Sequence, residues 1–353
     1  MKIEKKLSKR EFFRGLGKGA LAAAATSPML TAESAATTYS NTSYSPNIFP
    51  KTIKPNLIAP GATIGLVATA TLVSEEAIRW AISNLERLGF AAKLGKNVRE
   101  KFGYLAGTDD QRAKDLNEMF SDSAVEAIWC LKGGWGSARI LDRINYGNIK
   151  DSRKPIVGYS DVTSLLSAIH RKTGLITYHG PNAVYGESEY TEQLFLETLT
   201  GRNEQTLFSH EDAETRTIRG GRASGRLVGG NLTVLTSIIG SGYEPDFQGT
   251  ILFLEDVSEP AYKVDRMLTQ LQLSGVLNKI RGVVFGTCAR CTGSEKAFSV
   301  EQVLRLHFER LNIPSFIGAS IGHVLHKMTL AIGARVKIDA YNHTIQYVDH
   351  FDS

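Results

Sequence analysis

Apolar and polar residues follow two periodicities along the first half of the chain. Short apolar runs such as 62–70 are bounded by glycine and polar residues and predict buried strands. A stretch with apolar residues at helical spacing, 74–90, begins at a capping Ser74 and stops at Gly89. We expect further strands at 91–98, 124–134 and 154–160, and helices at 109–122, 136–144 and 161–174. Such alternation is typical of a parallel sheet covered by helices, with ligands at the carboxyl ends of its strands.

The pattern changes near residue 200. Residues 201–222 are polar and contain no long apolar run, so we interpret them as an inter-domain segment. Beyond them the sequence predicts β-rich segments at 225–240, 249–257 and 280–287, helices at 261–277 and 299–311, and a terminal hairpin at 334–348. The predicted fold class is therefore α/β, with a parallel-sheet N-terminal domain at 56–200 and a smaller, mixed and β-richer C-terminal domain at 223–353.

The N-terminal residues have the layout of an export signal. Residues 1–36 contain a basic stretch, the mild apolar run GALAAAATSPML and then small residues. The segment SKREFF resembles the twin-arginine consensus, with Lys9 in place of the first arginine. The apolar run is far shorter than the roughly 20 residues of a membrane span, so we expect no stable membrane anchor. We predict an exported, periplasmic protein with a linker at 37–55; a cytoplasmic protein with a basic tail is the alternative.

Most of the net charge belongs to that N-terminal segment. The chain carries +5, and the seven basic and three acidic side chains of residues 1–36 account for +4 of it. The rest of the chain is therefore close to neutral. Without a basic stripe in the body of the protein, we expect no nucleic-acid partner.

The three cysteines are too few for a disulfide framework. Cys288 and Cys291 stand in CARC, but zinc normally needs a second such pair or nearby histidines, so we expect no metal there. Two unconnected thiols at a strand end are the favoured interpretation. A reversible disulfide is the alternative.

The strand expected at 154–160 runs directly into Gly-Tyr-Ser-Asp and then into a helix. This is the layout of a nucleophile elbow, in which a tight turn exposes the hydroxyl of Ser160 and a helix N-terminus faces the reacting carbonyl. The same residue types also suit an ordinary helix cap. Val162 stands where such an elbow usually has a second glycine, so the local pattern by itself favours the cap.

A glycine-rich stretch, LKGGWGSARIL at 131–141, also lies between an expected strand and an expected helix. Exposed backbone N–H groups in such loops bind anions or developing oxyanions. A phosphate loop needs Lys and Ser or Thr after the last glycine, and Ser137 and Ala138 stand there instead. The stretch therefore predicts either an oxyanion site or a plain tight turn.

Acidic and histidine residues supply the remaining candidates. The strand ILFLEDV carries Glu255 and Asp256 near its end. A buried carboxylate there either orients a catalytic histidine or pairs with Lys263, Arg266 or a helix N-terminus. Eight histidines are present. His323 lies in the glycine-flanked stretch 318–334, and His179 and His326 are rival bases. The residues themselves leave this choice open.

Taken together and in order, these stretches resemble the LD-carboxypeptidase family of serine peptidases, which also contains the microcin C immunity peptidases. Matching segments run from about residue 57 to 340, and include FGYLAGTDDQRAKDLNEMFSD, LKGGWGSARIL, IVGYSDVTSLL, TYHGPN, ILFLEDVSEPAYKVDRMLTQL and GHVLHKMTLAIGA. The resemblance implies a triad of Ser160 as nucleophile, Glu255 as charge relay and His323 as general base and acid. It also selects Glu255 over Asp256.

The resemblance has further implications for the site. It places the nucleophile in the N-terminal domain and the other two triad members in the C-terminal domain, so the active site would form at their interface. It implies an oxyanion hole from the backbone N–H groups of Gly134 and Asp161. It implies no metal and no organic cofactor, and it suggests a homodimer.

The family's main activity removes the terminal D-alanine of murein tetrapeptides by hydrolysing an L,D amide bond, so a murein peptide is the expected substrate. The second hypothesis is a microcin-immunity-type hydrolase of aminoacyl or peptidyl nucleotides. Such an enzyme needs an aromatic platform, and segment 183–193 offers Tyr185 and Tyr190 but no Trp. The third hypothesis is a non-catalytic muropeptide-binding protein.

Overall fold

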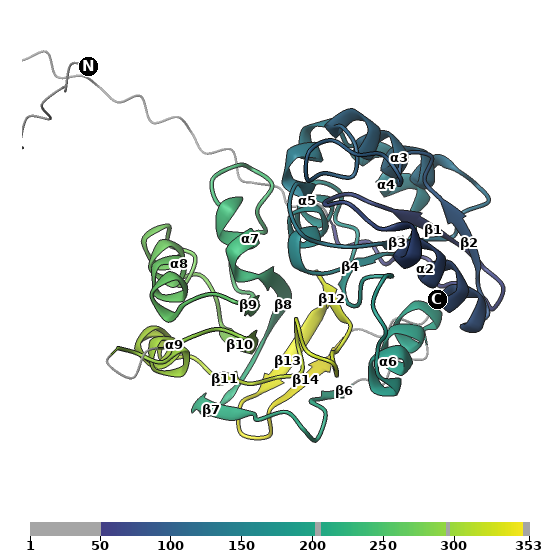
Figure 1. The fold of residues 1–353 in the computed structure, drawn as a ribbon. Coiled ribbons are helices and arrows are strands. Elements are labelled where there is room, and N and C mark those ends of the chain that lie inside the picture. Colours follow the sequence, from purple (N-terminus) through teal and green to yellow (C-terminus); the bar gives the residue numbers. More distant parts are fainter. Residues whose placement is uncertain (1–50, 202–205, 294–296, 349–353) are drawn as a thin grey trace, which may run out of the picture. The chain divides into compact units, whose positions relative to one another are not determined.

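A computed structural model describes residues 51–201, 206–293 and 297–348 (Figure 1). The predicted export signal, 1–36, lies outside these residues, as does most of the predicted linker at 37–55. The described residues of this single chain test neither export nor dimerisation, so both stay predictions. Within the described ranges, no helix combines the length and apolar character that crossing a membrane requires.

The N-terminal sheet has six strands in the order β12-β5-β4-β3-β1-β2 (Figure 1). Five of them run parallel to one another, and they are β1 (Thr63–Val67), β2 (Ala91–Leu94), β3 (Ala127–Cys130), β4 (Ile156–Gly158) and β5 (Thr177–His179). The sixth, β12 (Leu330–Ile332), comes from near the C-terminus and pairs antiparallel with β5. The parallel α/β arrangement predicted for this half of the chain is confirmed.

Helices follow these strands, and those at 75–87, 109–121, 137–143 and 163–173 lie where the apolar spacing predicted them, whereas 146–152 and 189–200 were not predicted. They are α2 (Glu75–Arg87), α3 (Asp109–Ser121), η1 (Ser137–Arg143, a 3-10 helix), α4 (Tyr146–Ser152), η2 (Ser160–Val162, also 3-10), α5 (Thr163–Thr173) and α6 (Glu189–Thr200). The expected cap is present, because the side chain of Ser74 accepts a hydrogen bond from the Ala77 N–H at 3.2 Å. Gly89, the expected stop, has a φ of +84°.

The C-terminal sheet has eight strands in the order β6-β14-β13-β8-β9-β10-β11-β7. A parallel centre is formed by β8 (Arg222–Asn231), β9 (Ile251–Val257), β10 (Gly282–Ala289) and β11 (Ser315–Ile317). Antiparallel strands flank it: β6 (Thr206–Phe208), β7 (Arg216–Arg219), and the predicted hairpin of β13 (Arg335–Asp339) and β14 (Thr344–Tyr347). The mixed, β-richer character predicted for this domain is confirmed.

Helices α7 (Leu232–Ser237), α8 (Ala261–Leu273) and α9 (Val300–Phe308), with the 3-10 turn η3 (Glu309–Leu311), complete the C-terminal domain. The central strand β9 separates two apolar clusters. Ile251 and Phe253 belong to a cluster that continues into the N-terminal domain, whereas Leu252 and Leu254 belong to one that includes α7, α8 and α9. Successive side chains of a strand point to opposite faces, so the next residue, Glu255, faces the N-terminal domain.

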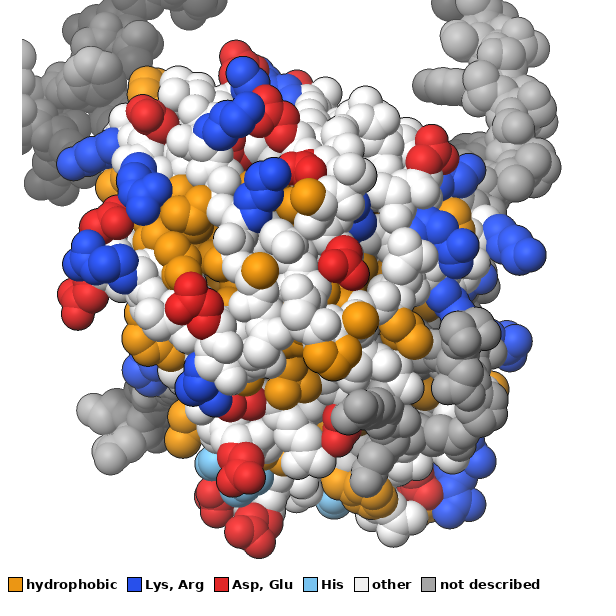
Figure 2. All heavy atoms as spheres, turned by 90° about the vertical axis from the view of Figure 1, so that its right-hand side faces the viewer, with side chains coloured by type: hydrophobic (Ala, Val, Ile, Leu, Met, Phe, Trp, Pro, Cys, Tyr) orange, Lys and Arg blue, Asp and Glu red, His pale blue; other side chains and the backbone are white. Residues whose placement is uncertain are grey.

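Charged side chains of both signs are distributed over the face that Figure 2 shows. Lys and Arg lie among Asp and Glu there, without a continuous basic stripe on that face. This agrees with the nearly neutral charge that the sequence gives to residues 37–353.

The pairing of β8 with β9 depends on a glycine, and this gives a first prediction. Gly229 has a φ of +145°, and a Cβ there would lie 1.8 Å from the carbonyl oxygen of Phe253. Both the backbone conformation and the steric overlap disfavour a side chain. We expect Gly229→Ala to lower the free energy of unfolding by about 3 kcal/mol, measured by urea denaturation.

A matched control separates the two effects. Gly240 has a φ of +86°, but a Cβ there would meet nothing within 4 Å. Gly240→Ala should therefore cost only the conformational penalty of about 1 kcal/mol. Equal losses for the two variants would show that the close approach of β8 to β9 contributes nothing.

Candidate active site

Ser160 occupies a strained turn between β4 and α5. Its φ is +63°, a left-handed conformation that residues other than glycine rarely adopt. The N-cap residue of η2 is Tyr159, and that of α5 is Val162. Among the described hydrogen bonds, none has the Ser160 side chain capping either helix. The helix-cap interpretation that the local sequence favoured is therefore wrong. Strain of this kind persists where the surrounding structure holds a functional group in place.

Two glycines allow this turn to form. A Cβ on Gly158 would lie 2.8 Å from the Val162 side chain and 3.1 Å from that of Cys130. A Cβ on Gly133 would lie 3.1 Å from Ser160 Oγ and 3.3 Å from the backbone nitrogen of Asp161. The glycine-rich loop after β3 therefore passes directly beside the serine hydroxyl, and only a residue without a side chain fits there.

The two residues predicted to form the oxyanion hole lie around this contact. The Asp161 N–H is next to Gly133, and none of the described hydrogen bonds assigns it an acceptor. The Asp161 carboxylate is occupied elsewhere, because it accepts the Ser137 N–H at 2.7 Å; burial raises its pKa. Gly134 follows Gly133 with a φ of +113°, and a Cβ there would lie 2.5 Å from Thr71. The role of these N–H groups stays a prediction.

Glu255 is fully buried at the end of β9 and lies between two imidazoles. Its Oε2 is 2.8 Å from Nδ1 of His323, and its Oε1 is 3.9 Å from Nε2 of His179. Burial by itself raises the pKa of a carboxyl group, but His179 and His323 outweigh it and lower the pKa of Glu255 to about 2. Glu255 is thus a carboxylate at every pH near neutrality.

The loop that carries His323 approaches Glu255 closely. Gly322 has a φ of +97°, and a Cβ there would lie 2.3 Å from Glu255 Oε2. The His323 ring also contacts Tyr159, the neighbour of Ser160, with ring centroids 4.8 Å apart. The described hydrogen bonds do not include one between Ser160 and His323; such bonds are often long before substrate binds. The structure therefore brings the Glu255–His323 pair to the turn that carries Ser160.

His179 is a functional candidate whose place the sequence did not reveal. It ends β5, and its ring lies 5.2 Å from that of Phe253 and 6.1 Å from that of Tyr159. It was predicted as a rival base, but the structure places it on the opposite oxygen of Glu255 from His323. The other rival, His326, lies 3.5 Å from Asp212.

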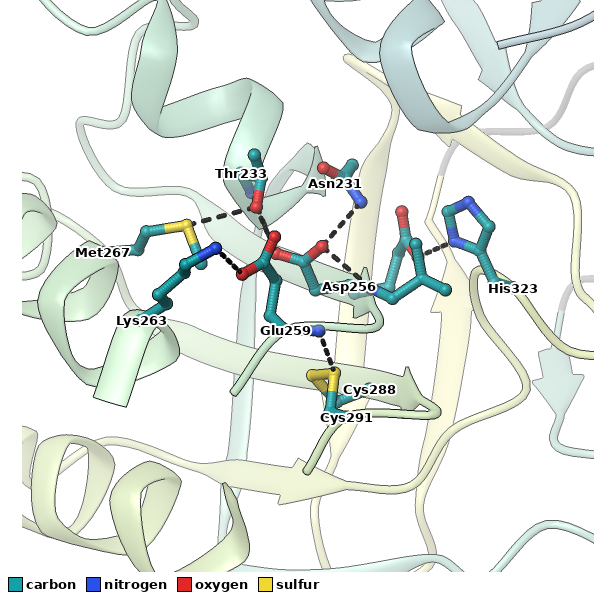
Figure 3. The surroundings of a disulfide bond; sticks show 11 residues. Asn231, Thr233, Asp256, Glu259, Lys263, Met267, Cys288, Cys291 and His323 are labelled. Carbon is teal, nitrogen blue, oxygen red and sulfur yellow. Dashed lines mark hydrogen bonds and ion pairs between the residues drawn. A yellow bond between two sulfur atoms is a disulfide. The ribbon is translucent and has the colours of Figure 1, made fainter. Parts of the chain in front are cut away.

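Asp256 points away from the histidines, as alternation along β9 requires. Its carboxylate accepts hydrogen bonds from the Thr233 N–H at 3.0 Å, the Thr233 hydroxyl at 2.9 Å and the Asn231 amide at 3.2 Å (Figure 3). The predicted alternative paired the two strand-end acids with Lys263, Arg266 or a helix N-terminus. It is confirmed for Asp256, because Thr233 is the second residue of α7, but neither Lys263 nor Arg266 is the partner. Lys263 pairs with Glu259 at 3.2 Å, and Arg266 lies over the Tyr262 ring.

Cys288 and Cys291 form a disulfide at the end of β10 (Figure 3). The sequence favoured two unconnected thiols, and that interpretation is wrong: the strand ends in a turn that brings the two Cα atoms to 5.4 Å, a separation that a disulfide can span. Cys288 lies opposite Asp256 in the pairing of β10 with β9. The disulfide therefore closes the strand end beside the Glu255–Asp256 pair.

Comparison with known proteins gives the same assignment for both halves of the chain. Residues 64–180 match the model of the LD-carboxypeptidase N-terminal domain, and residues 224–338 that of the LD-carboxypeptidase C-terminal domain. A Bacillus subtilis protein named probable murein peptide carboxypeptidase is 37% identical over 308 residues, which cover 84% of this chain and 95% of that protein.

Solved structures agree with this assignment. The microcin C7 self-immunity protein MccF, known from Escherichia coli, superposes with a TM-score of 0.79 at 27% identity, covering 86% of this chain and 99% of that one. The muramoyltetrapeptide carboxypeptidase from Oxalobacter formigenes superposes with a TM-score of 0.72 at 28% identity, covering 81% and 98%. The chain therefore belongs to the LD-carboxypeptidase family of serine peptidases.

Proposed function

We propose that this protein hydrolyses the L,D amide bond that holds the terminal D-alanine of murein tetrapeptides, through a triad of Ser160, His323 and Glu255. The observation that carries the proposal is the left-handed Ser160 beside the pair formed by His323 and the buried Glu255. The names of the Bacillus subtilis and Oxalobacter formigenes relatives support the choice of substrate.

The geometry suits general-base catalysis by His323. Glu255 is ionised, and its Oε2 accepts a hydrogen bond from Nδ1–H of His323, so it fixes the tautomer whose Nε2 carries the lone pair. Nε2 takes the proton of the Ser160 hydroxyl as Oγ attacks the amide carbonyl. The resulting imidazolium, stabilised by Glu255, returns that proton to the nitrogen of D-alanine, and the C–N bond breaks.

The second half of the reaction reuses the same groups. Water loses a proton to Nε2 of His323 and attacks the acyl-enzyme ester, and the imidazolium returns a proton to Ser160 Oγ as the ester breaks. The tetrahedral oxyanion of each half would be held by the N–H groups of Asp161 and Gly134. Donors in such a buried, fixed geometry stabilise developing charge without reorganisation.

The role of Ser160 can be tested directly. We expect Ser160→Ala to reduce D-alanine release from a murein tetrapeptide by about 10⁴-fold or more, because the nucleophile is lost. A matched control is Ser167→Ala on α5, since the buried Ser167 hydroxyl makes none of the described hydrogen bonds. Release by Ser160→Ala at close to the wild-type rate would refute the assignment, and binding without any release by the wild type would favour a muropeptide-binding protein.

The role of Glu255 predicts a different signature. Glu255→Gln should lower kcat by about 10³- to 10⁴-fold, because an amide neither fixes the reactive tautomer nor stabilises imidazolium. Asp256→Asn is the matched control: its carboxylate contacts Thr233 and Asn231 instead of a histidine, so the pH profile of kcat should be unchanged. A larger kcat loss in Asp256→Asn than in Glu255→Gln would exchange the roles of the two acids.

The lowered pKa of Glu255 also predicts how stability depends on pH. The group titrates at about 2 in the folded protein instead of its usual 4.5, so its ionised form stabilises the fold above pH 4.5 and this stabilisation is lost as the pH falls toward 2. The Tm difference between wild type and Glu255→Gln should therefore shrink steadily over that range. A constant difference would mean that the carboxylate is not stabilised by the histidines.

Similarity to MccF supports a second candidate, hydrolysis of an aminoacyl or peptidyl nucleotide. Of the two tyrosines that the sequence offered as a nucleobase platform, Tyr185 is 40% exposed. Tyr190 is engaged, since its hydroxyl donates to the Phe208 carbonyl at 2.6 Å and its ring contacts His210. The Tyr185 ring lies edge-on to that of Tyr159 at 6.5 Å. One partly exposed tyrosine makes a poorer platform than an exposed aromatic pair, so we favour the peptide.

Competing substrates decide between the two candidates. The purified protein would be given a tetrapeptide ending in D-alanine and, separately, aspartyl sulfamoyl adenosine, with products followed by mass spectrometry. We expect D-alanine release with a kcat/KM at least about 100-fold above that for the nucleotide. The opposite preference would establish the immunity-type activity instead.

A further inference from the structure

Three side chains gather on two segments outside the proposed triad. His210 and Asp212 lie in the connection between β6 and β7, and His326 lies in the loop that carries His323. The two imidazole rings stack face to face, with centroids 3.6 Å apart and planes within 3°. Asp212 Oδ2 lies beside both rings, 3.4 Å from His210 Nδ1 and 3.5 Å from His326 Nε2.

These spacings are too long for strong hydrogen bonds, but they match a tetrahedral metal site. With metal–ligand bonds of about 2.0–2.1 Å, neighbouring ligand atoms of a tetrahedron lie about 3.3 Å apart. The one ligand atom from each of the three residues lies within 4.8 Å of the other two. Two imidazoles and one carboxylate are also a donor set that zinc accepts.

The stacked arrangement has to change when an ion binds. The Asp212 N–H donates to Nδ1 of His210 at 3.2 Å, and this bond uses the single lone pair of that nitrogen. An ion lying between rings stacked at 3.6 Å would also be outside the planes of both rings, whereas an imidazole lone pair lies in the ring plane. Metal binding therefore requires the two rings to turn out of the stack toward a shared ion.

Surrounding contacts hold the two segments together before any ion binds. The His210 N–H donates to Ser320 Oγ at 2.9 Å, and the Ser320 N–H donates to Ser209 Oγ at 3.3 Å. The Tyr190 ring lies edge-on to His210 at 5.2 Å and to His326 at 6.4 Å. These contacts bring the two segments together, while the buried Nδ1 of His326 makes none of the described hydrogen bonds.

The cluster is also accessible. The Asp212 side chain is 74% exposed, which leaves an entry path from solvent. A cavity of about 390 Å³ is lined by all three residues and by Ser320. This cavity has room for water molecules in the coordination positions that the protein leaves open.

We propose that His210, Asp212 and His326 form a binding site for a divalent transition-metal ion of the zinc class. The ion would bridge the β6–β7 connection to the loop that carries His323, three residues before His326. It takes no part in the serine chemistry proposed above. Its consequence is to stiffen the loop that positions His323 and to raise the stability of the folded protein.

The test is titration of metal-free, untagged full-length protein with Zn²⁺ by calorimetry, and with Co²⁺ by visible absorption. We expect one ion per chain, a rise in Tm, and the intense absorption of tetrahedral Co²⁺. His210→Gln and His326→Gln should each weaken binding at least about tenfold, and Asp212→Asn should weaken it less, because it removes one exposed ligand.

Two controls locate the ion. His307→Gln removes an imidazole that pairs with Asp265 at 2.7 Å in a different part of the domain, and should leave affinity unchanged. His323→Gln should also leave it unchanged; if this variant abolishes binding, the ion belongs to the triad and the proposal is wrong. It is equally wrong if wild type binds no ion, or if His210→Gln and Asp212→Asn, shown to be folded by their Tm in EDTA, both bind normally.

Discussion

The buried charge of Glu255 is the constraint on which the site depends. A carboxylate with no exposed surface is costly unless it is compensated, and here imidazoles approach both of its oxygens. One imidazole, His179, ends a strand of the N-terminal sheet, and the other, His323, comes from a C-terminal loop. Compensating this charge therefore requires both domains to be in place, so the interaction that prepares the general base also links the two halves of the fold.

Close backbone approaches make this arrangement sterically feasible. Gly322 lets its loop reach Glu255, and Gly133 lets the loop after β3 reach Ser160. Gly229 lets β8 lie against β9, the strand that ends in Glu255. At each position a single methyl group would overlap an atom of the site or of the strand that positions it. The site is thus specified as much by where side chains are missing as by the polar residues themselves.

Much of the fold could be predicted from the sequence because it follows local rules. The strand–helix alternation, the Ser74 cap and the terminal hairpin rest on periodicity and capping, and the structure contains all three. The strands that apolar spacing did not reveal lie where pairing is long-range. Polar residues 201–222 contain β6 and β7, which lie at the two edges of the C-terminal sheet, where one side of a strand needs no partner. Likewise, β12 joins a sheet built from residues more than 150 positions earlier.

For the site, the sequence predicted the identity of the triad residues better than their contacts. Ser160, Glu255 and His323 could be named from a family resemblance, while local pattern alone favoured a cap for Ser160 and left Glu255 and Asp256 equivalent. Alternation along β9 separates the two acids once its faces are known, because Phe253 and Glu255 share one face. His179 could be named from the sequence only as a rival base; its contact with Glu255 could not be predicted, since it depends on the meeting of two sheets. The Cys288–Cys291 disulfide likewise depends on the turn that ends β10.

The central claim is that the strained Ser160 is a nucleophile activated by the Glu255–His323 pair. Labelling with a fluorophosphonate, which reacts covalently with activated serines, followed by peptide mapping, tests it most directly. We predict one adduct per chain, on Ser160, that forms in the wild type and is lost in His323→Gln. An adduct on another residue, or equal labelling of the two proteins, would contradict it.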